Sequence, residues 1–317
     1  MSLKTKVLNG LKWSFLDQIV LQVVFVVFSI FLARILNPSD FGIVGMITIF
    51  SGFAALFIDM GFGTALIQKQ DVSEDYFSSV FWLNLTLGVL LYLFFFFLAP
   101  YLALFYNEPK LVLLVRITCM SFVINALTSI QHFLLIKNLQ FKKKVIFNWV
   151  SMIFGYVVAF ILAKKGFGYW ALVFMTLSSA IVNSFLLWIS SSWRPKFIFH
   201  WAKIKELSSF GLNVLGDTSV NYWSRNYDNF IIAKMLGSTE LGIYTRAYSL
   251  MLLPLKNITS VISKVMFPAF SKKQGDVQNI KMHYLKIVKL IGLITFPAMI
   301  GLSFVSSELL QYAMKCW

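Results

Sequence analysis

The sequence predicts an all-α integral membrane protein, a multi-span helical bundle with a two-bundle architecture in which the second bundle is incomplete. Three observations predict this fold class. Hydrophobic residues make up 58% of the 317 positions and charged residues 13%, whereas soluble domains average about 45–50% and about 25%. The mean hydropathy is +0.76, and long apolar segments recur along the whole chain. Two similar segments 200 residues apart indicate an internal repeat.

The apolar segments are long enough to cross a membrane as helices, which takes roughly 18 or more mostly apolar residues. Their approximate bounds are 13–36, 40–66, 78–100, 112–136, 145–163, 168–190, 207–236, 240–266 and 285–305, and a further one begins near Leu309. The first segment follows Lys4 and Lys6, as a secretory signal would, but it is too long and no small-residue cleavage site follows it. We therefore predict a retained first helix and a cytoplasmic N-terminus.

The positive charges support this orientation, because short cytoplasmic loops collect Lys and Arg. When alternate loops are assigned inward from the N-terminus, eighteen Lys and Arg residues fall in the inner loops and six in the outer loops. A net charge of +15 could also indicate nucleic-acid binding. The topology already explains where these cations lie, so we expect contacts with anionic membrane lipids and no nucleic-acid partner.

The cysteines and histidines do not indicate a metal or cofactor site. Cys119 lies within a predicted span and Cys316 at the end of the chain, so neither a disulfide framework nor a paired thiolate site is predicted. His132, His200 and His283 lie near loops that we predict to be cytoplasmic, with no H-x-x-x-H spacing. We expect no metal ion and no cofactor.

The internal repeat consists of two similar stretches, each next to a long apolar segment. ARILNPSDFGI at 33–43 and AKMLGSTELGI at 233–243 have a cation, a turn and an acid in the same places. Asp17 and Asp217, in the preceding apolar segments, keep the same offset. Repeats of apolar hairpins are typical of membrane proteins built from two similar halves, which are often transporters.

The boundary between the halves is predicted at a loop rich in cations and aromatic residues. We predict an N-terminal six-helix bundle at 1–190, a cytoplasmic linker at 191–206 and a partial C-terminal bundle at 207–317. Because six spans separate the copies, both enter the membrane in the same direction, which suits two bundles facing each other across a central cleft. Only three spans and the start of a fourth follow the linker, so we expect a fragment or an early-terminated product.

The seventh span carries a row of polar residues. Asn221, Arg225 and Asp228 are spaced i, i+4 and i+7, which places them on one face of a helix, and Asp217 precedes them on that face. A charge at the bilayer centre costs roughly 2.5–3.5 kcal/mol on insertion scales, so we expect this face to line a wet cleft. Two alternatives stay open. Arg225 and Asp228 could merely neutralise each other, or Asp217 could lie near the membrane interface.

Charged residues also occur in other spans. Arg246 and Lys256 in the eighth span call for an anionic partner, and none is obvious in their own helix. Because guanidinium groups bind phosphate oxygens in bidentate fashion, such a cleft suits a diphosphate or an acidic sugar. The carboxylates of Asp17, Asp59 and Asp217 are candidates for ion coupling, with salt bridging or cation coordination as the alternative.

Two blocks of sequence carry a resemblance to a known family. The first lies at 40–85 and includes DFGIVGMITIF and DMGFGTALIQKQDVSEDYFSSVFWLNL, and the second, at 224–272, begins SRNYDNFIIAKMLGSTELGIYTRAY. They resemble the Wzx-type polysaccharide exporters of the multidrug/oligosaccharidyl-lipid/polysaccharide (MOP) superfamily, especially the colanic-acid and teichuronic-acid exporter branch. The resemblance implies a MOP/MATE-like fold of two six-helix bundles. It also implies flipping of polyprenyl-diphosphate-linked oligosaccharide from the cytoplasmic to the outer leaflet by alternating access, with undecaprenyl diphosphate as carrier.

The resemblance also implies a location, partners and a set of cavity residues. The location is the bacterial inner membrane, and the further partners are a polysaccharide polymerase and glycosyltransferases. Members of the family are usually longer than this chain. Together with the polar residues above, the family-like segments SRNYDNF and YTRAY give the expected substrate-binding residues Asn221, Arg225, Asp228, Asn229, Tyr244, Arg246 and Lys256.

Two other functions compete with this interpretation. A drug or organic-cation antiporter of the same superfamily would share the two-bundle shape, but it would favour acidic residues that bind organic cations. A membrane polysaccharide polymerase or ligase would act on the same lipid-linked substrate. Such an enzyme needs a sizeable exported loop that bears catalytic groups, and the predicted outer connections are too short. We therefore expect a transporter and not an enzyme.

Overall fold

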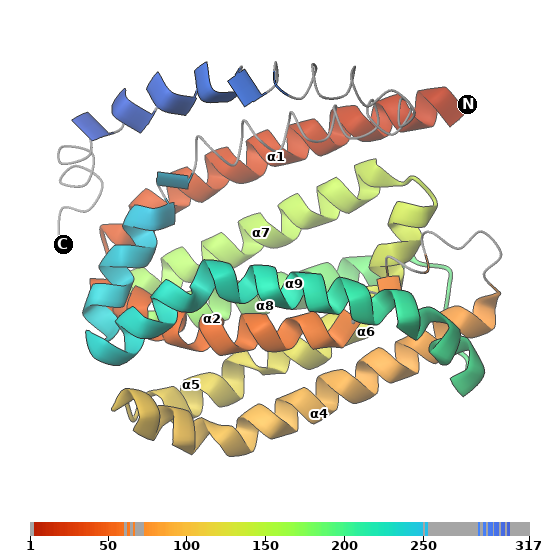
Figure 1. The fold of residues 1–317 in the computed structure, drawn as a ribbon, viewed down its shortest axis with the longest axis horizontal. Helices are drawn as coiled ribbons and strands as arrows, with labels where there is room; N and C mark the ends of the chain where they lie inside the picture. The colour runs from red at the N-terminus through yellow and green to blue at the C-terminus, as the bar shows by residue number, and fades with distance from the viewer. Residues whose placement is uncertain are drawn as a thin grey trace. The chain divides into compact units, whose positions relative to one another are not determined.

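The structure is a computed structural model of the chain, and it describes residues 3–59, 62–63, 66, 73–249, 251–252 and scattered positions from 285 to 304. The chain divides into two compact units, Met1–Gly242 and Ile243–Trp317, each of which is described by itself. The helices of the first unit (Figure 1) are α1 (Leu3–Ala33), α2 (Pro38–Asp59), α4 (Glu74–Tyr106), α5 (Leu111–Thr118), α6 (Met120–Lys137), α7 (Phe141–Lys164), α8 (Tyr169–Ser190) and α9 (Trp201–Met235).

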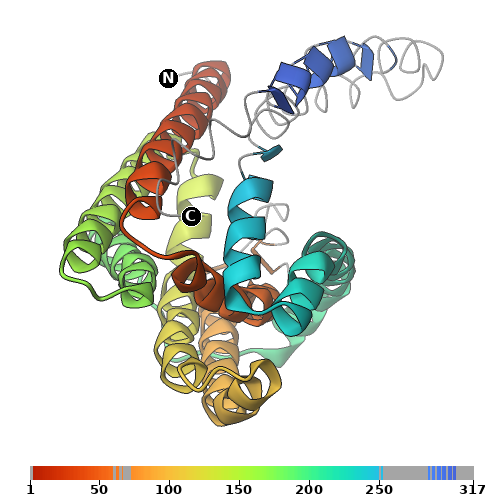
Figure 2. The same cartoon turned by 90° about the vertical axis from the view of Figure 1, so that its left-hand side faces the viewer.

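The first six predicted spans correspond to helices that can cross a membrane by length and composition. These are Lys12–Ala33, Pro38–Ile58, Glu74–Tyr106, Leu111–Lys137, Phe141–Lys164 and Tyr169–Ser190. The seventh predicted span is helical too, as α9. It is not one of the six, because charged and polar residues interrupt its apolar sequence. Helix α2 lies in the middle of the bundle, in contact with α4, α6, α8 and α9 (Figure 2).

One predicted span ends too early. The predicted bounds are 78–100, but α4 continues through Pro100 to Tyr106. Proline has no backbone N–H, so the carbonyl of Phe96, four residues earlier, loses its partner within the helix. The Arg116 side chain replaces that partner, because its Nε donates to the Phe96 carbonyl oxygen at 3.3 Å. The guanidinium also lies 4.3 Å from the centroid of the Phe96 ring.

Short turns make successive helices antiparallel, so the loops gather at two ends of the first unit. We call one the Asp40 end. It holds the turns after α1, α4, α7 and α9, as shown by the hydrogen bond from the Tyr169 N–H to Asp40 Oδ1 at 3.0 Å and by the one from Ser238 Oγ to Glu108 Oε1 at 3.1 Å. We call the other the Lys196 end. It holds the start of α1, the α6–α7 turn and the segment 191–200 (Figure 1).

At the Asp40 end the two copies of the internal repeat touch each other. A Cβ on Gly42 would collide with the carbonyl oxygen of Ser238, and a Cβ on Gly242 would collide with the carbonyl oxygen of Pro38. Pro38 and Ser238 are equivalent positions of the repeat, as are Gly42 and Gly242. The contact is therefore reciprocal, as a two-fold relation between the copies would produce. Glycine is required on both sides for the backbones to come this close.

At the Lys196 end the segment 191–200 is tied to the start of α4. Lys196 Nζ lies 2.5 Å from Glu74 Oε2, and Lys203 Nζ lies 2.8 Å from Asp75 Oδ2. The hydrogen bond with Glu74 raises the pKa of the Lys196 ammonium above its usual value. The Trp82 indole N–H also donates to the Lys196 carbonyl oxygen at 2.8 Å. These contacts hold the segment that precedes α9 and so fix where α9 begins.

Candidate functional site

The candidate site is the polar face of α9, and its orientation is set by the opposite, packed face. There the Tyr222 hydroxyl lies 3.0 Å from the Thr48 carbonyl oxygen and 2.9 Å from that of Ile49, both in α2. Trp223 packs against Phe53 of α2 at 5.4 Å between ring centroids. These aromatic contacts anchor α9 to α2 and turn its polar residues away from that helix.

The polar residues lie on the side of α9 that these contacts leave open. Asp217, Asn221 and Arg225 are exposed, and Asp228 is half-buried. The structure brings Asn221 and Arg225 together, because Arg225 Nε donates a hydrogen bond to Asn221 Oδ1 at 2.9 Å. Among the described residues the Arg225 Nη atoms have no hydrogen-bond or ion-pair partner. The amide therefore orients the guanidinium and leaves its two outer nitrogens available to a ligand.

The Arg225 and Asp228 side chains do not form an ion pair with each other in the part of the chain that the structure describes. Asp228 Oδ1 instead accepts the backbone N–H of Asn229 at 2.8 Å. The Asn229 Oδ1 atom is buried and receives no hydrogen bond from the described residues. Beside them, the Tyr227 side chain is 59% exposed, so an aromatic surface accompanies the charged groups.

The three coupling candidates lie in different surroundings. Asp17 of α1 accepts the indole N–H of Trp149 from α7 at 2.8 Å. Asp217 is exposed on α9. Asp59 is the last residue of α2, and its side chain lies outside the described part. Within the described residues, no three His, Cys, Asp or Glu side chains come together as metal ligands would.

The remaining predicted cavity residues belong to the second unit. The Tyr244 ring stacks on that of Tyr248, with centroids 5.7 Å apart and planes 14° apart. The Arg246 carbonyl oxygen accepts a hydrogen bond from Ser249 Oγ at 2.8 Å. Lys256 lies outside the described residues.

Two features of the first unit were not predicted from the sequence. One is the set of ion pairs between the start of α4 and the segment 191–200. The other is a polar pocket formed by α6, α7 and α8 at the Lys196 end. A sequence signal for the pocket exists, because no Asp or Glu occurs between Glu108 and Glu206 although many Lys and Arg do. Such a stretch is expected to attract anions wherever it folds around a cavity.

Comparison with known proteins settles the family. The model of the family described as "Polysaccharide biosynthesis protein" matches residues 31–314. The chain belongs to this family. Among its relatives, "Teichuronic acid biosynthesis protein TuaB" of Bacillus subtilis is 32% identical over 96% of this chain and 64% of that protein. "Lipopolysaccharide biosynthesis protein WzxC" of Escherichia coli is 27% identical over 97% of this chain and 63% of that protein. The chain thus spans less than two thirds of the length of either relative.

A solved structure shows the same fold. A multidrug resistance MATE family transporter of the MOP superfamily, in an inward-facing conformation, superposes with a TM-score of 0.68. The match covers 92% of this chain and 72% of the transporter at 16% identity. The predicted all-α, multi-span membrane fold and the Wzx-type resemblance are both confirmed. This member of the polysaccharide biosynthesis family is an integral membrane protein with the fold of MOP-superfamily transporters.

Proposed function

We propose that this protein is a flippase that moves a polyprenyl-diphosphate-linked oligosaccharide from the cytoplasmic to the outer leaflet by alternating access. Family membership supports this function, as do relatives named for teichuronic acid and lipopolysaccharide biosynthesis. A further relative, 28% identical, is "Succinoglycan biosynthesis transport protein ExoT" of Rhizobium meliloti. The proposed activity is transport and not catalysis, with undecaprenyl diphosphate as the lipid carrier.

The open face of α9 is the observation that carries the proposal. Arg225 is oriented by Asn221 and keeps its Nη atoms available, which is the geometry needed for bidentate contact with phosphate oxygens. Asp228 and Asn229 could accept and donate hydrogen bonds to sugar hydroxyls, and Tyr227 supplies a ring face. Tyr244, Arg246 and Lys256 are also proposed as substrate-binding residues. A diphosphate with an attached sugar matches this chemistry better than an organic cation does.

The proposed orientation places the Lys196 end in the cytoplasm of a bacterial cell, with the protein in the inner membrane. The start of α1, the α6–α7 turn and the segment 191–200 share this end. Part of the inner set of cations assigned from the sequence lies in or beside these segments, namely Lys4, Lys6, Lys142, Lys143, Arg194 and Lys196. Glycosyltransferases would supply the substrate on this side, and a polymerase would receive it on the other. We also propose 1–190, 191–206 and 207–317 as the two bundles and their linker.

Replacement of Arg225 by glutamine tests the substrate site. Loss of charge-assisted hydrogen bonds to phosphate is expected to reduce export about tenfold or more. Export is measured in cells that lack their own exporter, as surface polysaccharide and as lipid-linked repeat unit retained inside. Lys205→Gln is the matched control, because Lys205 is an exposed cation on the same helix about five turns from Arg225 and should leave export unchanged.

Equal export by the Arg225→Gln variant and by the unmodified protein would refute the assignment of this site. If the cells instead lose resistance to a cationic dye while polysaccharide export stays normal, the protein is an organic-cation antiporter. A third result separates transport from catalysis. Normal export with shortened polysaccharide chains would indicate a polymerase or ligase.

Asp17 is the coupling candidate whose surroundings are described most fully. Asp17→Asn keeps an oxygen that can accept the Trp149 indole N–H, but it removes the titratable charge. If protons couple through Asp17, flux into membrane vesicles should become insensitive to collapse of the proton gradient while the sodium gradient is kept. Unchanged sensitivity in Asp17→Asn vesicles would place the coupling at another residue.

A further inference from the structure

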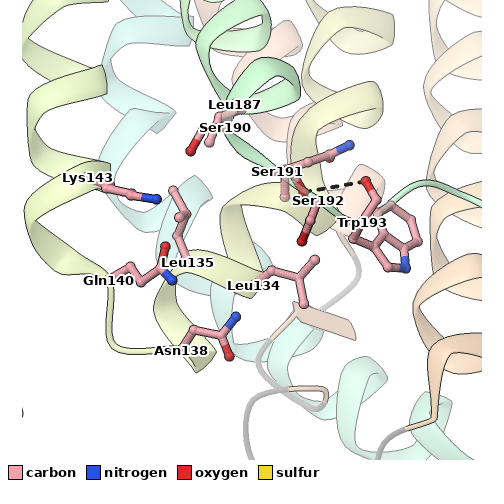
Figure 3. A pocket seen from close by; sticks show the side chains of 11 residues that line it. Leu134, Leu135, Asn138, Gln140, Lys143, Leu187, Ser190, Ser191, Ser192 and Trp193 are labelled. Atoms are coloured by element: carbon pink, nitrogen blue, oxygen red, sulfur yellow. Dashed lines mark hydrogen bonds between the residues drawn. The ribbon is translucent and has the colours of Figure 1, made fainter.

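A second polar site lies away from the α9 face. A pocket of about 260 Å³ is formed by the end of α6, the start of α7, the end of α8 and the residues that follow α8 (Figure 3). Its floor includes Gln131, which is 1% exposed, and Leu187, which is 4% exposed. Its rim includes the exposed residues Asn138, Lys143 and Ser192. The pocket thus has a buried floor with one amide and one leucine, and an open polar mouth.

The Gln131 amide points to a polar occupant. Its Oε1 and Nε2 atoms are both buried, and neither has a hydrogen-bond partner among the described residues. An unsatisfied buried amide destabilises a protein unless a ligand or water completes its hydrogen bonds. Because Gln131 lines the pocket, a small movement of its buried side chain lets an entering group donate to Oε1 and accept from Nε2.

The charges around the pocket favour an anion. All its lining residues fall in the stretch between Glu108 and Glu206, which contains no acidic residue. Lys143 extends from the first turn of α7 toward the pocket (Figure 3), and it forms no ion pair with any described residue. The start of α7 faces the same space through Gln140 and Lys143, and a helix N-terminus attracts negative charge.

The opposing effect of the α8 C-terminus is neutralised by an arginine. A helix C-terminus carries partial negative charge on its free carbonyl oxygens. Arg194 covers this end, because its Nη2 donates to the Trp188 carbonyl oxygen at 3.1 Å and its Nη1 donates to the carbonyl oxygen of the C-cap residue Ser191 at 2.5 Å. Ser190 at the end of α8 and Ser192 after it can therefore offer hydroxyl groups to an anionic ligand without the usual electrostatic repulsion, whereas Ser191 Oγ donates to the Trp193 carbonyl oxygen at 3.5 Å.

We propose that this pocket binds a phosphate-bearing headgroup that also carries hydroxyls, such as the glycerol phosphate group of phosphatidylglycerol. Lys143 pairs with the phosphate, the serines hydrogen-bond at the rim, and Gln131 binds the innermost hydroxyl. The volume of about 260 Å³ is smaller than the roughly 300–1,000 Å³ of sites for drug-sized ligands. It therefore suits a headgroup and not an oligosaccharide. The site does not depend on the function proposed for α9, because no α9 residue lines it.

Thermal unfolding of the purified protein in phosphatidylcholine-containing micelles tests this site. Added dioleoyl-phosphatidylglycerol should raise the Tm in a saturable way. Lys143→Gln should weaken the apparent affinity about tenfold or more. Lys142→Gln is the matched control. Lys142 is the adjacent exposed cation, it lies 5.4 Å from the Trp13 ring centroid, and it does not line the pocket.

Gln131→Leu separates loss of binding from loss of folding. It removes the unsatisfied amide, so without ligand this variant should melt at the same or a higher temperature than the unmodified protein. Its response to phosphatidylglycerol should be lost. A variant that keeps the full response would overturn the proposal, because the amide would then have no role in binding.

Soluble probes identify the source of the headgroup. A saturable response to phosphatidylglycerol alone supports a membrane lipid, and a response to sn-glycerol 3-phosphate as well supports the headgroup chemistry without the acyl chains. If inorganic phosphate raised the Tm as much as phosphatidylglycerol and sn-glycerol 3-phosphate do, the proposed role of the ligand hydroxyls would be overturned. Absence of any saturable response, or equal losses in Lys142→Gln and Lys143→Gln, would overturn the site.

Discussion

Replacement of Gly42 by valine is expected to separate the two copies of the internal repeat and to destabilise the protein by roughly 3 kcal/mol or more. The new side chain would collide with the backbone carbonyl of Ser238, which cannot rotate away as a flexible side chain could. The backbone at Gly42 cannot shift easily to relieve the collision, because the neighbouring residues are buried: Phe41 is 4% exposed and Ile43 is 3% exposed. The Tm in detergent measures the loss, and the yield of folded protein in membranes provides a second readout.

The reciprocal contact supplies its own internal test. Gly242→Val should cost about as much as Gly42→Val, because its Cβ would meet the equivalent carbonyl, that of Pro38. Gly216→Ala is the control, since Gly216 lies in α9 with nothing within 4 Å of the added Cβ. This change should be neutral or stabilise the helix by up to about 1 kcal/mol. If Gly42→Val were tolerated as well as Gly216→Ala, the two repeat copies would not be in close contact.

The sequence predicted the first six spans well, because each span is a property of about twenty consecutive residues and needs no knowledge of the fold. Most of the spans predicted after position 240 lie outside the described residues. The sequence also predicted that Asn221 and Arg225 lie on one face of a helix, which follows from the period of 3.6 residues. Helix ends were harder to predict. The span predicted at 78–100 is too short, because α4 continues through Pro100 to Tyr106, and Arg116 bonds the Phe96 carbonyl that the proline leaves free.

Contacts between distant segments could not be predicted from sequence patterns alone. The repeat was visible in the sequence, yet the reciprocal packing of Gly42 and Gly242 depends on how the two turns meet in space. The environment of Gln131 could not be predicted either, because in the sequence it is one polar residue within an apolar span. Its isolation inside a pocket appears only when α6, α7 and α8 are placed together.

Replacement of Asp40 by alanine is the second change expected to have a large effect. Asp40 Oδ2 accepts the Asn37 N–H at 3.0 Å, as the third residue of a capping box does at the start of α2. Its Oδ1 accepts the N–H of Tyr169, the first residue of α8, also at 3.0 Å. One carboxylate thus caps two helix N-termini, where negative charge is favoured. Loss of both caps should cost about 2–3 kcal/mol of stability, measured as a fall in Tm.

Asp40→Asn and Asp217→Asn complete this series. An asparagine at position 40 keeps one carbonyl oxygen, so it can accept only one of the two N–H groups well and should show an intermediate loss. Asp217 is exposed on α9, and Asp217→Asn should leave the Tm nearly unchanged. Glycine at position 168 leaves room for the Asp40 carboxylate, because a Cβ there would lie 3.0 Å from Asp40 Oδ1. Equal Tm values for Asp40→Ala and Asp217→Asn would show that the shared cap does not stabilise the Asp40 end of the protein.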